Sequence, residues 1–201
     1  MTTFTDPSSR NFFWHGHTGG DGFGYSAQRG PSGSTIYDRC PALLDVFTRV
    51  TSKEVREALQ NNGRRVFNHP YRLVFMHGCC AATGDLCTAF GIPREQVDVT
   101  KYTNKRKVPA RAFIGAKDIT DEYWGYELAA KRYHHSFRVF FRHWMVFDTV
   151  SFALQRGKSP YDPNDSLDSG EEYPSGKVRD PLDESFVVYG ATDLRRLGGM
   201  P

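Results

Sequence analysis

This 201-residue chain contains no apolar run near the roughly 18 residues that a membrane-spanning helix requires, so we expect no membrane segment. Its first seven residues include neither the basic nor the apolar stretch of a signal peptide. The net charge of +3 is too small to indicate nucleic-acid binding. These absences predict a cytoplasmic protein that contacts neither membranes nor nucleic acids.

Cysteine is scarce as well. The chain has four cysteines, of which Cys79 and Cys80 are adjacent, and that spacing is not the framework of a disulfide-stabilised domain. A chain of 201 residues is also long enough to bury a core without disulfides or a structural metal. We therefore expect reduced thiols, no metal and no cofactor, with Cys40 and Cys87 serving as packing residues.

Short apolar strands alternate with helical segments along the chain. This alternation predicts an α/β fold, with a mainly parallel sheet flanked by helices. We expect strands at 11–15, 71–76, 110–116 and 185–189, and helices at 41–50, 51–61, 81–90 and, with a break near Asp148, 121–155.

Local patterns support this assignment. Thr51 and Glu54 have the spacing of a capping box, which opens a helix whose inward residues are expected to be Val55, Ala58 and Leu59. Two polar stretches are expected to be loops, namely the glycine-rich residues 16–34 and the basic residues 101–107. One buried helical face is predicted from the spacing of Phe137, Phe140, Phe141 and Trp144.

The predicted organisation is a single domain with loose ends. Residues 1–10 form a loose N-terminus and residues 11–156 the core. Residues 157–184 are rich in Pro, Asp and Ser and are expected to form a long loop. Residues 185–201 supply a closing strand and a tail.

Two clusters of reactive residues follow the first two strands. His-Gly-His stands at 15–17 and His-Gly-Cys-Cys at 77–80. In open parallel sheets the functional site lies where the strands end, and strands joined by one helical crossover are usually neighbours. We therefore expect a histidine and a cysteine to lie close enough to act together.

That combination is typical of nucleophilic catalysis. A cysteine thiolate attacks a carbonyl carbon, and a nearby imidazole transfers the proton to the leaving group. Backbone N–H groups at Gly78 and Gly16 could hold the oxyanion, since glycine lets a substrate backbone approach closely.

These stretches resemble a known family. Residues 12–17 and the glycines after them are similar to the strand and "GHG" element of caspase-like cysteine peptidases, which include caspases, metacaspases, legumains, gingipains and CHAT proteases. Residues 73–79 resemble the apolar strand that ends at the nucleophile in these enzymes. Similarity to later elements, closest to gingipain-like, CHAT and metacaspase members, continues at 111–116, 137–154 and 186–195.

The resemblance implies a caspase-hemoglobinase fold and peptide-bond hydrolysis. On this alignment His17 is the general acid/base and Cys79 the nucleophile. Metacaspases carry a double cysteine in which the second acts, so Cys80 is an alternative nucleophile. The family usually selects a charged side chain before the cleaved bond, and Asp21 and Asp118 are candidates for binding a basic one.

The chain also departs from the family pattern. Thr18 stands where the family usually has glycine after the catalytic histidine. Only sixteen residues precede His17, which is too few for the two strands and two helices that come first in the family. The resemblance therefore covers the C-terminal half of such a domain, with the histidine strand as an exposed edge. We expect either a fragment or a sheet completed by a partner chain or a homodimer.

Three other interpretations stay open. Caspase-like folds also occur as inactive scaffolds or interaction domains. A metal-dependent hydrolase could use His15 and His17, which alternate onto one face of a strand. An α/β-hydrolase would need a G-x-S-x-G elbow, and residues 30–34 do not have its final glycine.

Overall fold

The computed structural model describes residues 10–24, 49–60, 69–118, 120, 127–158, 182 and 184–196. The chain divides into two units. The first comprises Met1–Ile119 with Phe186–Thr192, and the second comprises Thr120–Ser185 with Asp193–Pro201.

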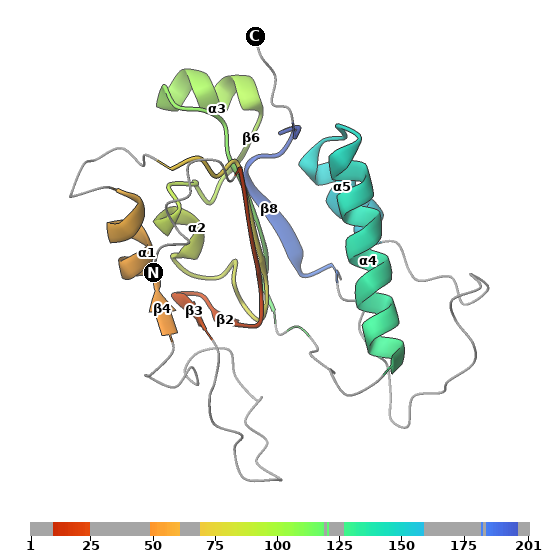
Figure 1. The fold of residues 1–201 in the computed structure, drawn as a ribbon. Coiled ribbons are helices and arrows are strands. Elements are labelled where there is room, and N and C mark those ends of the chain that lie inside the picture. The colour runs from red at the N-terminus through yellow and green to blue at the C-terminus, as the bar shows by residue number, and fades with distance from the viewer. Residues whose placement is uncertain are drawn as a thin grey trace. The chain divides into compact units, whose positions relative to one another are not determined.

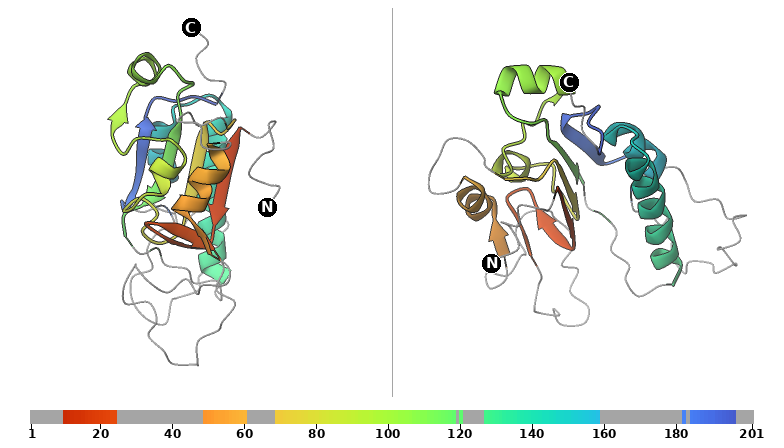
Figure 2. Two further views of the ribbon diagram at one scale, coloured as in Figure 1. Left: turned by 90° about the vertical axis from the view of Figure 1, so that its left-hand side faces the viewer. Right: turned by 45° about the horizontal axis from the view of Figure 1, so that its top comes forward.

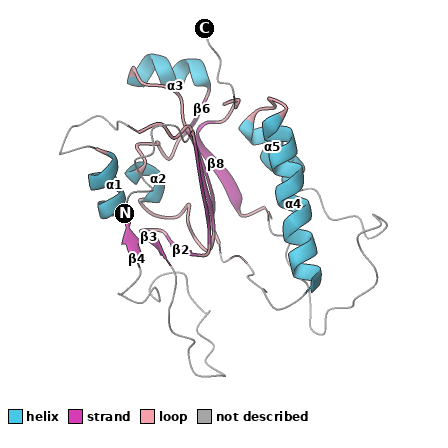
Figure 3. Cartoon of the chain, in the orientation of Figure 1, coloured by secondary structure: helices cyan, strands magenta, loops and turns pink. Residues whose placement is uncertain are grey.

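A five-stranded sheet organises the first unit, in the order β1-β5-β7-β8-β6 (Figures 1 and 3). Strands β1, β5 and β7 run parallel to one another, β8 is antiparallel to β7, and β6 is parallel to β8. The predicted mixed α/β fold with a mainly parallel sheet is therefore confirmed. The strands are β1 (Asn11–His15), β5 (Leu73–His77), β6 (Gln96–Val97), β7 (Ala112–Ala116) and β8 (Phe186–Ala191).

The central and edge strands differ as their sequences predict. Every residue of β5 is buried, as expected for a continuous apolar run that has a strand on each side. Strand β1 lies at one edge of the sheet among the strands described, and Phe13 is 44% exposed there. The expected edge position of this strand is therefore confirmed, while completion of the sheet by another chain stays a prediction.

One face of the sheet packs against two helices, α1 (Ser52–Leu59) and α2 (Leu86–Ala89), which lie on the same side (Figure 2). Val74 and Met76 of β5 point to this side, where they join one core cluster with Val55 and Leu59 of α1. Because side chains alternate along a strand, Phe75 and His77 belong to the opposite face. The buried residues of α1 and the alternate residues of β5 that face them therefore belong to one core.

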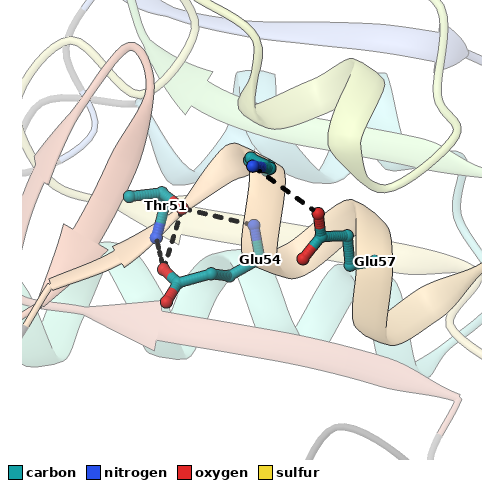
Figure 4. A network of polar contacts seen from close by, with 4 residues as sticks. Thr51, Glu54 and Glu57 are labelled. Carbon is teal, nitrogen blue, oxygen red and sulfur yellow. Dashed lines mark hydrogen bonds and ion pairs between the residues drawn. The ribbon is translucent and has the colours of Figure 1, made fainter.

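The capping box at the start of α1 is confirmed (Figure 4). The Glu54 N–H donates to Thr51 Oγ1 over 3.2 Å, and the Thr51 N–H donates to Glu54 Oε2 over 2.8 Å. Ala58, which was expected inside, is exposed, because only Val55 and Leu59 lie on the buried side of this short helix.

A second, antiparallel sheet corrects two expectations. Its strands are β2 (His17–Gly19), β3 (Gly22–Gly24) and β4 (Arg49–Thr51), so part of the expected glycine-rich loop and the end of the expected helix 41–50 are strands. Phe23 packs in the core and thereby fixes the glycine-rich segment to it. Residues 25–48, which include the remainder of both segments and Cys40 between them, lie outside the described residues.

The basic stretch 101–107 is also corrected, because it lies mostly in a helix, α3 (Val99–Arg106). The Asp98 side chain caps its first turn by accepting from the Lys101 N–H, and Tyr102 is buried on its inner face. Lys107 ends it in the left-handed conformation, with φ of 56°. The high charge of this stretch predicts a loop, whereas the structure has a capped helix with a single buried residue.

The second unit contains α4 (Glu127–Met145) and α5 (Val150–Gly157), which pack together. The predicted break is confirmed, since Thr149 caps α5 by accepting from the Phe152 N–H over 3.2 Å. The predicted inward residues are largely confirmed, because Phe140, Trp144, Val150, Ala153 and Leu154 are buried while Phe137 and Phe141 are half-buried. Most of the expected loop 157–184 lies outside the described residues. In the part of the chain that is described, neither unit has a helix with the length and apolar character to cross a membrane.

Candidate functional site

The ends of β1 and β5 are adjacent, as the sequence predicts. The two strands pair in parallel register with His15 opposite His77. Directly beyond this pair, the Gly16 N–H donates to the His77 carbonyl over 3.1 Å. The two reactive clusters therefore leave the sheet side by side.

Beyond the strands, the backbones of the two clusters come closer than side chains permit. A Cβ atom on Gly78 would lie 2.2 Å from the Gly16 carbonyl oxygen and 2.7 Å from Thr18 Oγ1. Gly16 itself has φ of 146°, a conformation that L residues with side chains rarely adopt. Glycine at 16 and 78 is therefore required by the geometry, independently of any oxyanion-binding role.

Thr18 joins the two segments through a side-chain hydrogen bond. Its hydroxyl donates to the Cys79 carbonyl over 2.5 Å, which joins the residue after His17 to Cys79 itself. Farther along, a Cβ atom on Gly84 would lie 2.1 Å from the Gly20 carbonyl oxygen, and the Leu86 N–H donates to that oxygen over 3.2 Å. The segment after β1 thus runs along the segment after β5.

The segment after β5 is also fixed to β7. The Cys80 N–H donates to the Asp118 carbonyl over 2.9 Å, and the Ala82 N–H donates to the Ala116 carbonyl over 2.8 Å. Thr83 closes a turn by donating its hydroxyl to the Cys80 carbonyl over 2.8 Å. The cysteine segment is therefore held between Thr18 of β2 and the residues at the end of β7.

The adjacent cysteines have different states. Cys79 keeps a reduced thiol and is half-buried. Cys80 is disulfide-bonded and is only 3% exposed, with φ of 54°. The expectation of reduced thiols is wrong for Cys80, and a buried sulfur in a disulfide offers no thiolate. This corrects Cys80 as the alternative nucleophile.

The other predicted site residues are placed as follows. His17 belongs to β2, where its backbone pairs with Gly24, while its side chain lies outside what the structure describes. Asp118 is exposed and joined through its backbone to Cys80. Asp21 is exposed as well, and its carbonyl accepts from the Ser52 N–H over 2.7 Å at the start of α1. Asp118 is thus joined directly to the cysteine segment.

Two histidines that the sequence pattern did not single out as a pair lie in contact. The Nδ1 atoms of His15 and His77 lie 2.7 Å apart, and the two rings stack with centroids 4.8 Å apart. His77 is fully buried, and its ring also stacks on Phe186 with the centroids 5.3 Å apart. Burial lowers the pKa of His15 below the usual 6.5. The signal was present in the sequence as a His-Gly dipeptide at the end of each of two strands.

A metal centre has no support in the described residues. Among them, no group of three or more His, Cys, Asp or Glu side chains could hold a metal ion. The metal interpretation pairs His15 with His17, and it stays a prediction because the His17 side chain lies outside the described residues.

No family model, curated protein or solved structure matches this chain.

Proposed function

We propose that this chain is a caspase-like cysteine endopeptidase in which Cys79 attacks the peptide carbonyl and His17 transfers the proton. Thiolate attack would form a tetrahedral intermediate, His17 would protonate the leaving amine, and water would then release the acyl group from the sulfur. Backbone N–H groups near Gly78 would stabilise the oxyanion. The caspase-hemoglobinase fold is part of the same proposal.

One observation carries it: the segments after β1 and β5 are joined at the positions the proposed mechanism uses. Thr18, next to His17, donates its hydroxyl to the carbonyl of Cys79, and the glycines at 16 and 78 allow the backbones to meet. Cys79 is half-buried at this junction, which supports the proposal because a nucleophilic cysteine must be partly accessible to its substrate.

The cysteines themselves supply a contrast within one chain. Cys87 lies in the core, where burial raises the pKa of its thiol to about 11. At pH 7 its thiolate fraction is then about one in ten thousand, so it serves as an unreactive reference for Cys79.

Asp118 supports a preference for basic substrates. The Asp118 side chain is exposed, and the Asp118 carbonyl accepts from the N–H of Cys80, the residue that follows Cys79. A carboxylate there would attract Arg or Lys before the cleaved bond, with Asp21 as the second candidate.

The disulfide at Cys80 bears on location. Disulfides persist mainly in oxidising compartments, so this bond opposes the expected cytoplasmic location. We propose that the enzyme works where Cys80 stays oxidised.

The decisive experiment is alkylation with iodoacetamide at pH 7 without reductant, with the modified residue identified by mass spectrometry. We expect Cys79 to react at least about a hundredfold faster than Cys87, and His17→Ala to slow Cys79 specifically. In parallel, fluorogenic peptides with Arg, Lys or Asp before the scissile bond are incubated with the protein.

Two variants serve as matched tests. Cys79→Ala should abolish hydrolysis, and Cys87→Ala should preserve it. Hydrolysis that survives Cys79→Ala would disprove the mechanism. Rapid Cys79 alkylation that is insensitive to His17, together with no hydrolysis of any peptide, would favour the inactive scaffold.

A further inference from the structure

The hydrogen bond between His15 and His77 limits how many protons the two rings can bind. With 2.7 Å between the Nδ1 atoms, one ring donates its Nδ1–H and the other accepts. A first proton on the donor's Nε2 leaves this bond intact. A second proton must occupy the accepting Nδ1, which removes the bond and places two cations in contact.

The pair stands at a sensitive point of the fold. Gly16 and Gly78 follow the two histidines directly, and the Gly16 N–H donates to the His77 carbonyl over 3.1 Å. Separating the rings would therefore pull on the junction that brings Thr18 to the Cys79 carbonyl.

The surroundings make the second proton costly. His77 is fully buried, and Phe186 of β8 stacks on it with an interplanar angle of 10°. The titratable groups on the adjoining segments are His17 and Asp21 after β1, Cys79 after β5, and Lys117 and Asp118 after β7. Of these, Asp21, Lys117 and Asp118 are exposed, where solvent weakens their influence on a buried ring.

We propose that His15 and His77 form a pH-sensitive clamp, which holds the segment after β1 against the segment after β5 and opens when the pair takes up a second proton. The clamp adds regulation to the proposed peptidase site, and in that sense it rests on the proposed function. Its opening is a backbone event, however, and can be measured without any activity.

The test is hydrogen–deuterium exchange of the peptides that contain residues 15–20 and 77–80, from pH 7.5 to 4.5, corrected for intrinsic exchange. In the native protein we expect protection to fall by up to about tenfold per pH unit on the acid side, since opening takes up one proton. Uniform protection across this range would overturn the proposal.

His15→Asn provides the matched variant, because an Asn amide can occupy the place of Nδ1 and hydrogen-bond without titrating. It should keep protection at pH 7 and lose the acid-side fall. His77→Asn is the second variant, should the first fail to fold. His143→Asn is the control, because His143 contacts Asp148 over 2.7 Å in the other unit, and it should behave as the native protein does.

The outcomes separate the two proposals. An acid-side fall that His15→Asn removes, in a protein without peptidase activity, would support the clamp and count against the enzyme. Peptidase activity with the same exchange profile in the native protein and His15→Asn would support the enzyme and overturn the clamp. If both hold, the acid limb of kcat/KM should move in His15→Asn.

Discussion

The two ends of the parallel strands both bury a histidine, yet they use it differently. At the amino ends, His69 Nε2 contacts the Phe90 carbonyl at 3.0 Å, and the Arg111 guanidinium donates to the His69 carbonyl over 3.1 Å. At the carboxyl ends, His77 contacts a second imidazole, and a half-buried thiol follows two residues later.

The difference separates structural burial from a candidate site. Both contacts described at the amino ends go to backbone carbonyls, which give buried polar groups a partner and fix the strands. At the carboxyl ends two backbones meet through glycines, and the thiol beside them has no role in the core cluster. A buried histidine is therefore not evidence of function until its neighbours include a reactive group.

The largest expected effect concerns the glycine contact. Gly78→Ala places a methyl group 2.2 Å from the Gly16 carbonyl oxygen, which belongs to backbone and cannot rotate away. We expect a loss of about 3 kcal/mol in the free energy of unfolding, measured by urea denaturation. Ala58→Gly, on the exposed side of α1, is the control and should cost about 1 kcal/mol. Equal losses for the two variants would mean that the two segments are not tightly joined.

His69, at the amino ends, should make the free energy of unfolding depend on pH. Burial and the Arg111 charge lower the pKa of His69 to about 4 from 6.5, so the unfolded chain takes up this proton first. The contribution of His69 is complete above pH 6.5 and is lost as the pH falls toward 4, a loss of about 3 kcal/mol.

His69→Gln tests this assignment, because the amide can replace Nε2 without titrating. Denaturation midpoints of the variant should change less between pH 7 and pH 4 than those of the native protein. Parallel curves for the two proteins would place the acid sensitivity elsewhere in the chain.

A smaller effect is expected at Thr18. Thr18→Val keeps the shape but removes the hydroxyl that donates to the Cys79 carbonyl, at a cost of about 1 kcal/mol. Thr18→Ser retains the donor and is the control. We expect Thr18→Val alone to change the alkylation rate of Cys79, and identical rates in both variants would remove Thr18 from the site.

The smallest effect belongs to the surface of α1. Thr51→Ala removes the hydroxyl that accepts from the Glu54 N–H but keeps the backbone N–H that donates to Glu54, so it should lower the free energy of unfolding by only about 0.5 kcal/mol. Because the capping hydrogen bonds join only Thr51 and Glu54, the alkylation rate of Cys79 should be the same in the variant as in the native protein. A change in that rate would mean that α1 and the cysteine segment are coupled.

Much of the fold was predictable, for local reasons. The apolar runs of β1, β5 and β7 and the caps at Thr51 and Thr149 are patterns of adjacent residues, and the structure has elements at all five. Helix α3 was missed because Asp98 and the single buried Tyr102 gave too little pattern against four basic neighbours. Strands β2 and β3 were missed because their glycines predict turns.

The candidate site divides in the same way. Adjacent strand ends carrying histidine and cysteine followed from the sequence, because parallel strands joined by one crossover tend to be neighbours. The His15–His77 contact, the Thr18–Cys79 bond and the oxidation of Cys80 did not, since each depends on strand register or on a contact between distant residues. The sequence specifies which chemical groups leave each strand, whereas the register of the sheet determines which of them touch.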